Sequence, residues 1–314
     1  FGTERLEHHA QTLAEAQTVA SGGPMRVRTL GSRVKENADT LLRAYRTCAQ
    51  ALQAGQTITP AAEWLLDNFH LVEQQLRHIH DDLPPGYYRQ LPKLSEAPFA
   101  GYPRVFGLAW AYVAHTDSLM SGPVLARYVR AYQQVQPLMI GEIWAVAITL
   151  RIVLIENMRR LAVQIVDGHA LRLRADAIVD AVLAARQSPG QSQLAVMQAA
   201  VAPFEAAPLP QIVAAQIAKR LRGFDPLHTP LLGWLEDRLN RQGTTIEDVV
   251  ANAQTRLGAS NVTMRNIVTS MRLVSEMDWA DFFEDVSLVD ARLRGDPTYA
   301  AMDFATRNRY RTEI

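Results

Sequence analysis

Residues 60–82 read PAAEWLLDNFHLVEQQLRHIHDD, and apolar side chains recur there at every third or fourth position. The recurring residues, counted one position past the segment, are Leu65, Phe69, Val72, Leu76, Ile79 and Leu83. This spacing places them on one face of an α-helix. Thr59-Pro60 is typical of a helix start, since a capping residue precedes a proline at the first helical position. The segment therefore predicts an amphipathic helix that buries one apolar stripe.

Helix signals of this kind recur along the chain, whereas the period-two alternation of strands is rare. The predicted helices lie near residues 3–20, 32–54, 60–82, 101–116, 122–136, 138–166, 171–187, 191–202, 209–222, 230–241, 245–257, 261–275 and 278–293. We expect an all-α protein, a bundle or array of roughly a dozen helices with no significant sheet. Residues 1–314 are interpreted as a single helical region, with a soft subdomain boundary near residue 188 as the alternative. Residues 81–103 form the longest irregular stretch.

The composition narrows the classes of function. The 32 Lys and Arg residues balance the 32 Asp and Glu residues, so net charge does not favour nucleic acid as a partner. Cys48 is the only cysteine, so neither an intrachain disulfide nor a cysteine zinc cluster can form. The most apolar stretch, residues 143–155, contains Arg151 and is shorter than the roughly 20 residues of a membrane-spanning helix. We expect no membrane span in this chain.

The predicted helix at 60–82 also carries a polar stripe. Its members are Glu63, Asp67, His70, Gln74, Arg77 and Asp81. Asp67 and His70 are three positions apart, so they could converge on one ligand. A solvated helix face is the alternative, and the weak specificity of the spacing favours it.

Residues 83–94, LPPGYYRQLPKL, form the most unusual segment. The candidate ligand-binding or partner-binding residues in and near it are Tyr87, Tyr88, Arg89, Lys93, Tyr102 and Arg104. Aromatic rings stack on sugars or on partner side chains, and arginine is frequent at interface hot spots. The alternative is an ordered loop that packs on its own fold, where tyrosine uses both ring and hydroxyl.

No catalytic centre is recognisable. His115 and Asp117 resemble a general-base pair, but Ser118 lacks a Gly-x-Ser-x-Gly elbow. No Asp-x-Asp element and no phosphate-binding glycine loop is present. A helical glycoside-processing enzyme would need two facing carboxylates. The candidates for such a pair are Glu63, Asp67, Glu73, Glu142 and Glu156.

Several strings together resemble the N-terminal region of bacterial cyclic β-1,2-glucan synthases. They are residues 59–70 (TPAAEWLLDNFH), 82–94 (DLPPGYYRQLPKL), 101–105 (GYPRV) running on to 114–117 (AHTD), 136–138 (QPL) with 141–145 (GEIWA), 261–263 (NVT) through 270–272 (SMR), and 301–304 (AMDF) with 306–308 (TRN). The resemblance covers nearly the whole chain and is weakest at 165–225.

The resemblance implies a very large parent enzyme of the bacterial inner membrane. Such an enzyme polymerises glucose from UDP-glucose with a divalent metal and then cyclises the β-1,2-glucan. Its catalytic motifs map onto no position here, so no catalytic residue, metal or cofactor is assigned to this chain. Residues 301–314 suggest a helix that is cut short, with Arg307, Arg309, Tyr310 and Arg311 exposed, so we expect the natural protein to continue.

The expected role is a non-catalytic scaffold or docking domain on the cytoplasmic side, whose partner is the rest of the synthase. Two alternatives stay open. One is a module that binds β-1,2-glucan or a nucleotide sugar through the segment at 83–104, and the other is a helical glycoside-processing enzyme.

Overall fold

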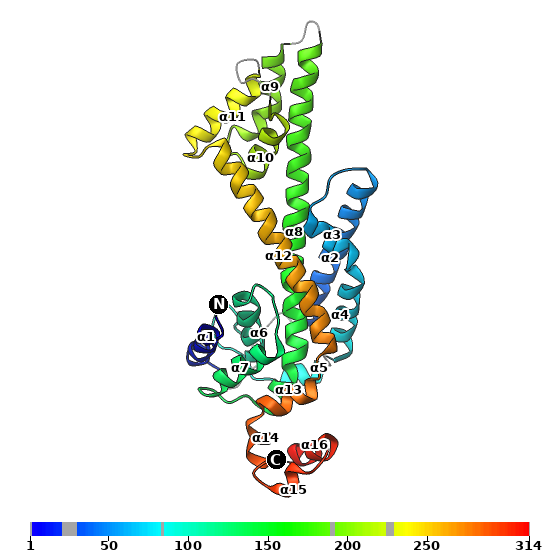
Figure 1. Ribbon diagram of the computed structural model, residues 1–314, viewed down its shortest axis with the longest axis vertical. Coiled ribbons are helices and arrows are strands. Elements are labelled where there is room, and N and C mark those ends of the chain that lie inside the picture. Colours follow the sequence, from blue (N-terminus) through cyan, green and yellow to red (C-terminus); the bar gives the residue numbers. More distant parts are fainter. Residues whose placement is uncertain (1, 21–29, 83–84, 189–191, 224–228, 314) are drawn as a thin grey trace. The chain divides into compact units, whose positions relative to one another are not determined.

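The computed structural model describes residues 2–20, 30–82, 85–188, 192–223 and 229–313 (Figure 1). These residues form sixteen α-helices and one short 3-10 helix, η1. Within the described ranges there is no strand, only the isolated bridges Val19–Leu94 and Lys93–Pro103. The predicted all-α fold class is confirmed.

The helices follow one another without a regular repeat in length. They are α1 (Thr3–Ala16), α2 (Leu30–Gln53), α3 (Pro60–Asp67), α4 (Phe69–Asp82), α5 (Pro85–Gln90), α6 (Arg104–His115), α7 (Gly122–Gln133), α8 (Ile140–Gln187), α9 (Gln193–Val201), η1 (Ala202–Phe204), α10 (Gln211–Arg220), α11 (Pro230–Arg241), α12 (Ile246–Glu276), α13 (Trp279–Val286), α14 (Leu288–Leu293), α15 (Pro297–Ala300) and α16 (Phe304–Thr312). None of the described helices has the length and apolar character needed to cross a membrane.

The chain divides into two compact units, each assembled from separated stretches of sequence. The first unit comprises Phe1–Tyr45, Trp64–Arg160 and Thr263–Ile314, and the second comprises Arg46–Glu63 and Leu161–Val262. Residue 188, near which a soft boundary was expected, falls inside the second unit.

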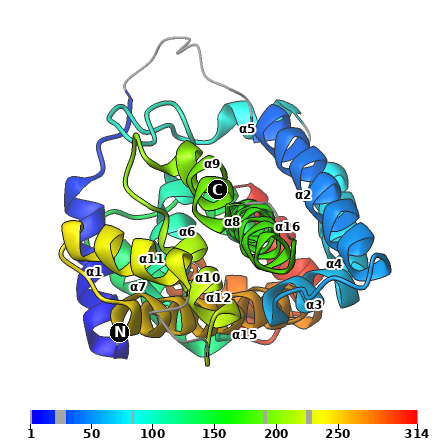
Figure 2. The same cartoon turned by 90° about the horizontal axis from the view of Figure 1, so that it is seen from above.

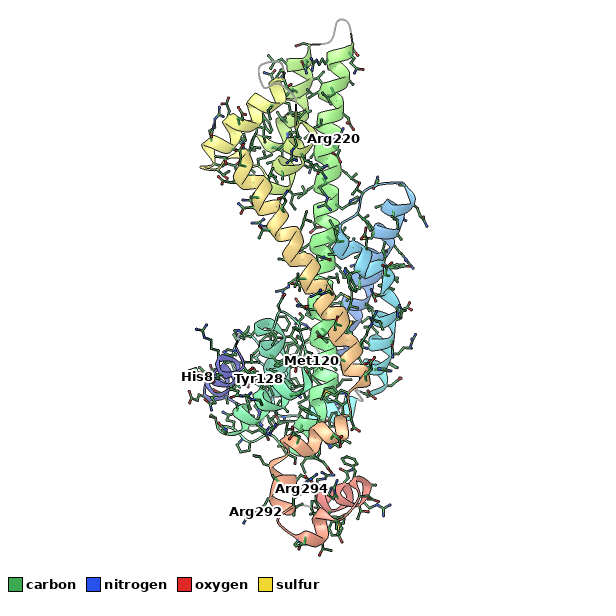
Figure 3. The ribbon with its side chains drawn as sticks, viewed as in Figure 1. His8, Met120, Tyr128, Arg220, Arg292 and Arg294 are labelled. Carbon is green, nitrogen blue, oxygen red and sulfur yellow. The ribbon has the colours of Figure 1, made fainter. Side chains whose placement is uncertain are left out.

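Helix α1 packs along α7 and also contacts α6 in the first unit (Figure 2). The interior beside these helices is rich in tyrosine. Tyr112, Tyr128 and Tyr132 are almost completely buried, and the ring centroids of Tyr112 and Tyr128 are 5.3 Å apart. Tyr128 is labelled in Figure 3. These rings contribute large buried areas, while their hydroxyls hydrogen-bond to backbone or side-chain oxygens.

The second unit has an apolar core built by α8 to α12. Its buried members are Ala175, Ile178, Val179, Val182, Met197, Val201, Phe204, Leu209, Val213, Ala214, Ile217, Leu221, Leu231, Leu235, Leu239 and Val249. Val182 and Met197 belong to this one cluster although they lie on opposite sides of residue 188.

The predicted helix over 60–82 is two helices, α3 and α4, separated at Asn68. The Asn68 Nδ2 donates to the Trp64 carbonyl at 2.9 Å, and its Oδ1 accepts from Arg272 at 2.6 Å. Asparagine side chains compete with the helix backbone in this way, and this contact accompanies the break. The apolar stripe is nevertheless buried as predicted at Leu65, Phe69, Val72 and Ile79. Leu76 is partly buried, and Leu83 lies outside the described residues.

Other predicted boundaries were also wrong. The helices expected at 138–166 and 171–187 are one helix, α8, which continues through Gly168. Those expected at 245–257 and 261–275 are likewise one helix, α12. A glycine within a helix costs only about 1 kcal/mol relative to alanine, so tertiary packing can outweigh it. The stretch expected to be irregular contains the short helix α5.

Candidate functional site

Tyr87 connects α5 to the start of α8 through a hydrogen bond. Its hydroxyl donates a hydrogen bond to the carbonyl of Gly141. Burial, together with the negative charge of Glu142, raises the pKa of Tyr87 to about 12. The phenol therefore stays protonated at neutral pH and can donate this hydrogen bond to the Gly141 carbonyl.

Tyr88 and Lys93 are paired with each other. The Lys93 ammonium donates to the Tyr88 carbonyl and lies 4.1 Å from the centroid of the Tyr88 ring, within cation–π range. Burial lowers the pKa of Lys93 to about 8 and raises the pKa of Tyr88. Arg89, between them in sequence, is exposed. Leu83 and Pro84, which open the predicted segment, lie outside the described residues.

Tyr102 belongs to a cluster around Glu156. Arg33 donates to the Tyr102 hydroxyl at 3.2 Å and to the Glu156 carboxylate at 2.9 Å. Asn37 and Arg159 also donate to Glu156, at 2.7 and 3.2 Å. Burial raises the pKa of Glu156, but the hydrogen bonds from Asn37 and Arg33 and the charges of Arg33 and Arg159 outweigh it and leave the pKa below its usual value. Glu156 is an ion-pair partner of Arg33 and Arg159.

Arg104 forms a buried ion pair with Glu142. The two residues are 7% and 0% exposed, and the Arg104 Nε lies 2.9 Å from the Glu142 Oε1. The guanidinium also donates to the Gln136 side chain at 3.0 Å and to the Pro137 carbonyl at 3.1 Å. Burial lowers the pKa of Arg104, but the hydrogen bonds and charge of Glu142 more than offset it, so the net shift is upward. This pair joins α6 to α8.

Asp67 and His70 are exposed on either side of the break at Asn68. In the part of the chain that the structure describes, neither forms a hydrogen bond or ion pair with the other predicted binding residues. No three His, Cys, Asp or Glu side chains converge there in a geometry that could hold a metal ion. The structure thus brings Tyr87, Tyr88, Lys93, Tyr102 and Arg104 into contacts within the fold and leaves Arg89, Asp67 and His70 at the surface.

His115 and Asp117 have different partners. The His115 ring lies 3.9 Å from the ring of His9 on α1. Asp117 accepts hydrogen bonds from Thr263 at 2.7 Å and from Asn266, both on α12. Asp117 and Ser118 have φ values of 49° and 62°, a left-handed conformation that is strained for residues other than glycine. The contacts to α12 hold this turn between α6 and α7.

Among the five candidate carboxylates, Glu142 and Glu156 are the buried ones, and each is held by arginine. Glu63, Asp67 and Glu73 are exposed on α3 and α4. A general acid needs a carboxyl that can exchange its proton with substrate. The two buried carboxylates instead accept hydrogen bonds from several fold residues at once.

An ion-pair network that the sequence pattern did not reveal lies between α13 and α16. Arg311 contacts Asp290 at 2.9 Å and Glu284 at 3.2 Å, and Arg307 contacts Glu284 at 2.8 Å. Arg294, labelled in Figure 3, contacts the same two acids. The expectation that Arg311 and Arg307 are exposed was wrong, since Arg311 is 2% exposed and the side chain of Arg307 is 13% exposed. Arg311 is buried because the acids on α13 and α14 neutralise it within the fold.

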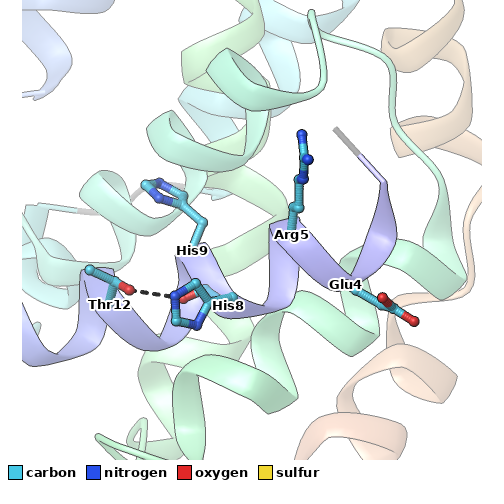
Figure 4. A pocket seen from close by; sticks show the side chains of 5 residues that line it. All are labelled: Glu4, Arg5, His8, His9 and Thr12. Atoms are coloured by element: carbon cyan, nitrogen blue, oxygen red, sulfur yellow. Dashed lines mark hydrogen bonds between the residues drawn. The ribbon is translucent and has the colours of Figure 1, made fainter.

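The described surface includes two hollows of several hundred cubic ångströms. The first has a volume of about 530 Å³ and is lined by Glu4, Arg5, His8, His9 and Thr12, all from α1 (Figure 4). Thr12 donates there to the His8 carbonyl at 3.1 Å. One helix supplies its whole lining, so its residues do not converge from several elements as in a typical ligand site.

The second hollow has a volume of about 400 Å³ and belongs to the second unit. It is lined by Met197, Gln198, Val201, Ala202, Glu205, Trp234, Asp237, Arg238 and Arg241. Residues about 40 positions apart meet there, so helical periodicity alone could not have found it. Trp234 was the available signal, because a tryptophan with polar neighbours on an amphipathic helix often lines a surface site.

Taken together, the fold and these contacts define a helical region whose buried acids are paired with arginines. No protein-family model matches the chain. The resemblance to cyclic β-1,2-glucan synthases is confirmed by a curated relative. The chain is 39% identical over 316 residues to the cyclic beta-(1,2)-glucan synthase NdvB of Rhizobium meliloti (strain 1021). The match covers 100% of this chain and 11% of that protein, so this chain is similar to one region of a much longer synthase.

Proposed function

We propose that this chain is a non-catalytic scaffold or docking region of a cyclic β-1,2-glucan synthase. Its partner is the remainder of that synthase, which polymerises glucose from UDP-glucose and cyclises the product. UDP-glucose and the divalent metal then bind to the remainder. The assembled enzyme is placed at the inner membrane, with this region on the cytoplasmic face.

The supporting observation is the state of the buried acids. Glu142, Glu156 and Asp290 each accept hydrogen bonds from arginine inside the first unit. Removing an arginine from such a pair would leave an uncompensated buried charge, so these carboxylates serve the fold. The described residues also contain no cluster of His, Cys, Asp and Glu that fits a metal.

A trans-complementation experiment tests the proposal. The synthase would be produced without this region, and the 314-residue chain would be supplied separately. We expect the two parts to co-purify, and we expect glucan synthesis from radiolabelled UDP-glucose to fall without the chain and to recover with it. The chain alone should convert neither UDP-glucose nor β-1,2-glucan.

Two outcomes would oppose the proposal. One is turnover of either sugar by the isolated chain. The other is a truncated synthase that makes the normal amount and size of glucan and does not retain the added chain.

A further inference from the structure

The second unit contains a pocket assembled from three elements. It lies where α9 and η1 meet α11, and its volume is about 400 Å³. Ligand pockets in proteins have volumes of roughly 300–1,000 Å³. Met197 and Val201 line it and are 5% and 2% exposed, so part of the lining belongs to the apolar core.

Trp234 is held in a defined orientation at this pocket. Its indole Nε1 donates to the Glu205 Oε1 at 2.9 Å. The indole also packs against the apolar core of the unit, so ring and hydrogen bond both restrict it. An aromatic side chain that is already ordered loses little conformational entropy when a ligand binds.

Arg238, on α11, stabilises the facing wall of the pocket, which is formed by the turn at the end of η1. Its Nη2 donates to the carbonyls of Phe204 at 2.8 Å, Glu205 at 3.1 Å and Ala207 at 2.7 Å. These bonds satisfy the carbonyl at the end of η1 and two carbonyls after it, and they tie this turn to α11. The Nη2 of Arg238 is therefore occupied by the protein, but its partners are neutral carbonyls, so the guanidinium keeps its positive charge.

The rim carries polar groups that the fold does not use. Gln198, Asp237 and Arg241 line the pocket and are exposed. In the described ranges no hydrogen bond or ion pair engages their side chains. They offer an amide, a carboxylate and a guanidinium, which together present both donors and acceptors.

This combination suits a neutral sugar. A pyranose ring has a face of C–H groups that packs on an aromatic ring, and its hydroxyls both donate and accept hydrogen bonds. A nucleotide sugar fits less well, because the carboxylates of Glu205 and Asp237 balance the two guanidinium groups in the lining and leave no excess positive charge for its phosphates.

We propose that this pocket binds a neutral glucan chain, with one hexose on Trp234 and neighbouring hydroxyls on Gln198, Asp237 and Arg241. The inference rests on the proposed function, since the synthase supplies the class of sugar. It adds a holding site for the polymer within the scaffold region.

Calorimetric titration of the 314-residue chain with linear β-1,2-glucan oligosaccharides tests the site. We expect saturable binding in the millimolar range or tighter. Trp234→Ala should weaken binding by at least about 10-fold, and Asp237→Asn and Arg241→Gln by roughly 3- to 10-fold each. UDP-glucose should bind more weakly than the oligosaccharide.

Matched variants separate binding from folding. Glu236→Gln removes the charge of the residue that precedes Asp237 on α11. Arg256→Gln removes the charge of an exposed arginine on α12. Neither residue lines the pocket. Trp279→Ala removes a half-buried tryptophan of the first unit whose indole donates to Val274. All three should bind the oligosaccharide like the unchanged chain.

The proposal is overturned if no oligosaccharide binds, if Trp234→Ala, Asp237→Asn and Arg241→Gln bind the oligosaccharide as tightly as the unchanged chain, or if UDP-glucose binds more tightly than the oligosaccharide. Its failure differs from failure of the scaffold role, because a chain that binds no glucan can still co-purify with the truncated synthase. Conversely, a chain that binds glucan without restoring synthesis would support the site and oppose the scaffold.

Discussion

The two units bury different kinds of side chain. The first unit buries Arg104 with Glu142, Glu156 beside Arg33, and Arg311 with the acids Asp290 and Glu284. The core of the second unit is apolar, and among its described residues Thr229 is the one buried polar side chain. Its ion pairs lie outside that core, where Arg220 on α10, labelled in Figure 3, contacts Asp176 and Asp180.

The two kinds of core differ in how many side-chain arrangements they tolerate. A buried ion pair gains enough attraction to offset desolvation only when its geometry and additional hydrogen bonds are satisfied. An apolar cluster accepts many packings of similar volume. We therefore expect the first unit to be sensitive to loss of charge and the second to loss of volume.

Glu142→Gln should have the largest effect. It keeps the shape of the side chain but leaves the Arg104 guanidinium buried without a counter-charge, which costs about 3–5 kcal/mol. Hydrogen–deuterium exchange should rise in α6 and at the start of α8 but not in α10 or α11. Glu73→Gln, at an exposed position on α4, is the control. The double variant Arg104→Met/Glu142→Leu should be more stable than Glu142→Gln alone, and an equally unstable double variant would oppose the ion-pair account.

Leu235→Ala should produce the largest effect of a single truncation in the second unit. Leu235 is 0% exposed within the apolar core, so its truncation leaves a cavity and costs about 3 kcal/mol. Urea unfolding, with exchange in α10 and α11 as the local probe, measures the loss. Leu235→Met, which nearly conserves volume, should cost less than about 1.5 kcal/mol. Equal effects of the two substitutions would show that volume is not what this core requires.

Asp180→Asn should change stability by less than about 1 kcal/mol. The side chains of Arg220 and Asp180 are 37% and 63% exposed, so solvent screens their attraction. The same urea unfolding detects the change, and Asp176 remains available to Arg220. A loss as large as that of Glu142→Gln would remove the contrast drawn between buried and exposed pairs.

His9 should give the smallest effect, and one that depends on pH. Burial and the positive charges of His115 and His8 lower the pKa of His9 from its ordinary value of 6.5. The unfolded chain then binds more protons, so this contribution to stability is present above pH 6.5 and is lost as pH falls through the lower folded pKa. Between pH 7 and pH 5 the unfolding midpoint should fall more in the unchanged chain than in His9→Gln. Identical pH profiles of the unfolding midpoint in the two chains would show that the His9–His115 ring pair does not affect stability.

Periodicity alone determined the helical class and the buried stripe of α3 and α4, because apolar spacing depends only on local geometry. Periodicity does not show what the charges within the apolar helix α8 contact: Glu156 is paired with Arg33 and Arg159. Arg151 instead donates to Gln75 at 2.6 Å and to the Val274 carbonyl at 3.3 Å, with a contact to His78. A local pattern shows that a buried charge needs a partner but does not identify a distant one.

Only the tertiary structure decided where helices end and what the polar residues do. Asn68 lies at the break between α3 and α4 and contacts Trp64 and Arg272, and the second of these is about 200 positions away in sequence. Tyr87 and Arg104, which composition marked as candidates for binding, are engaged by Gly141 and Glu142. The pocket beside Trp234 likewise exists only after α9 and α11 meet. Such outcomes depend on which distant groups a side chain encounters, and spacing along one helix carries no information about that.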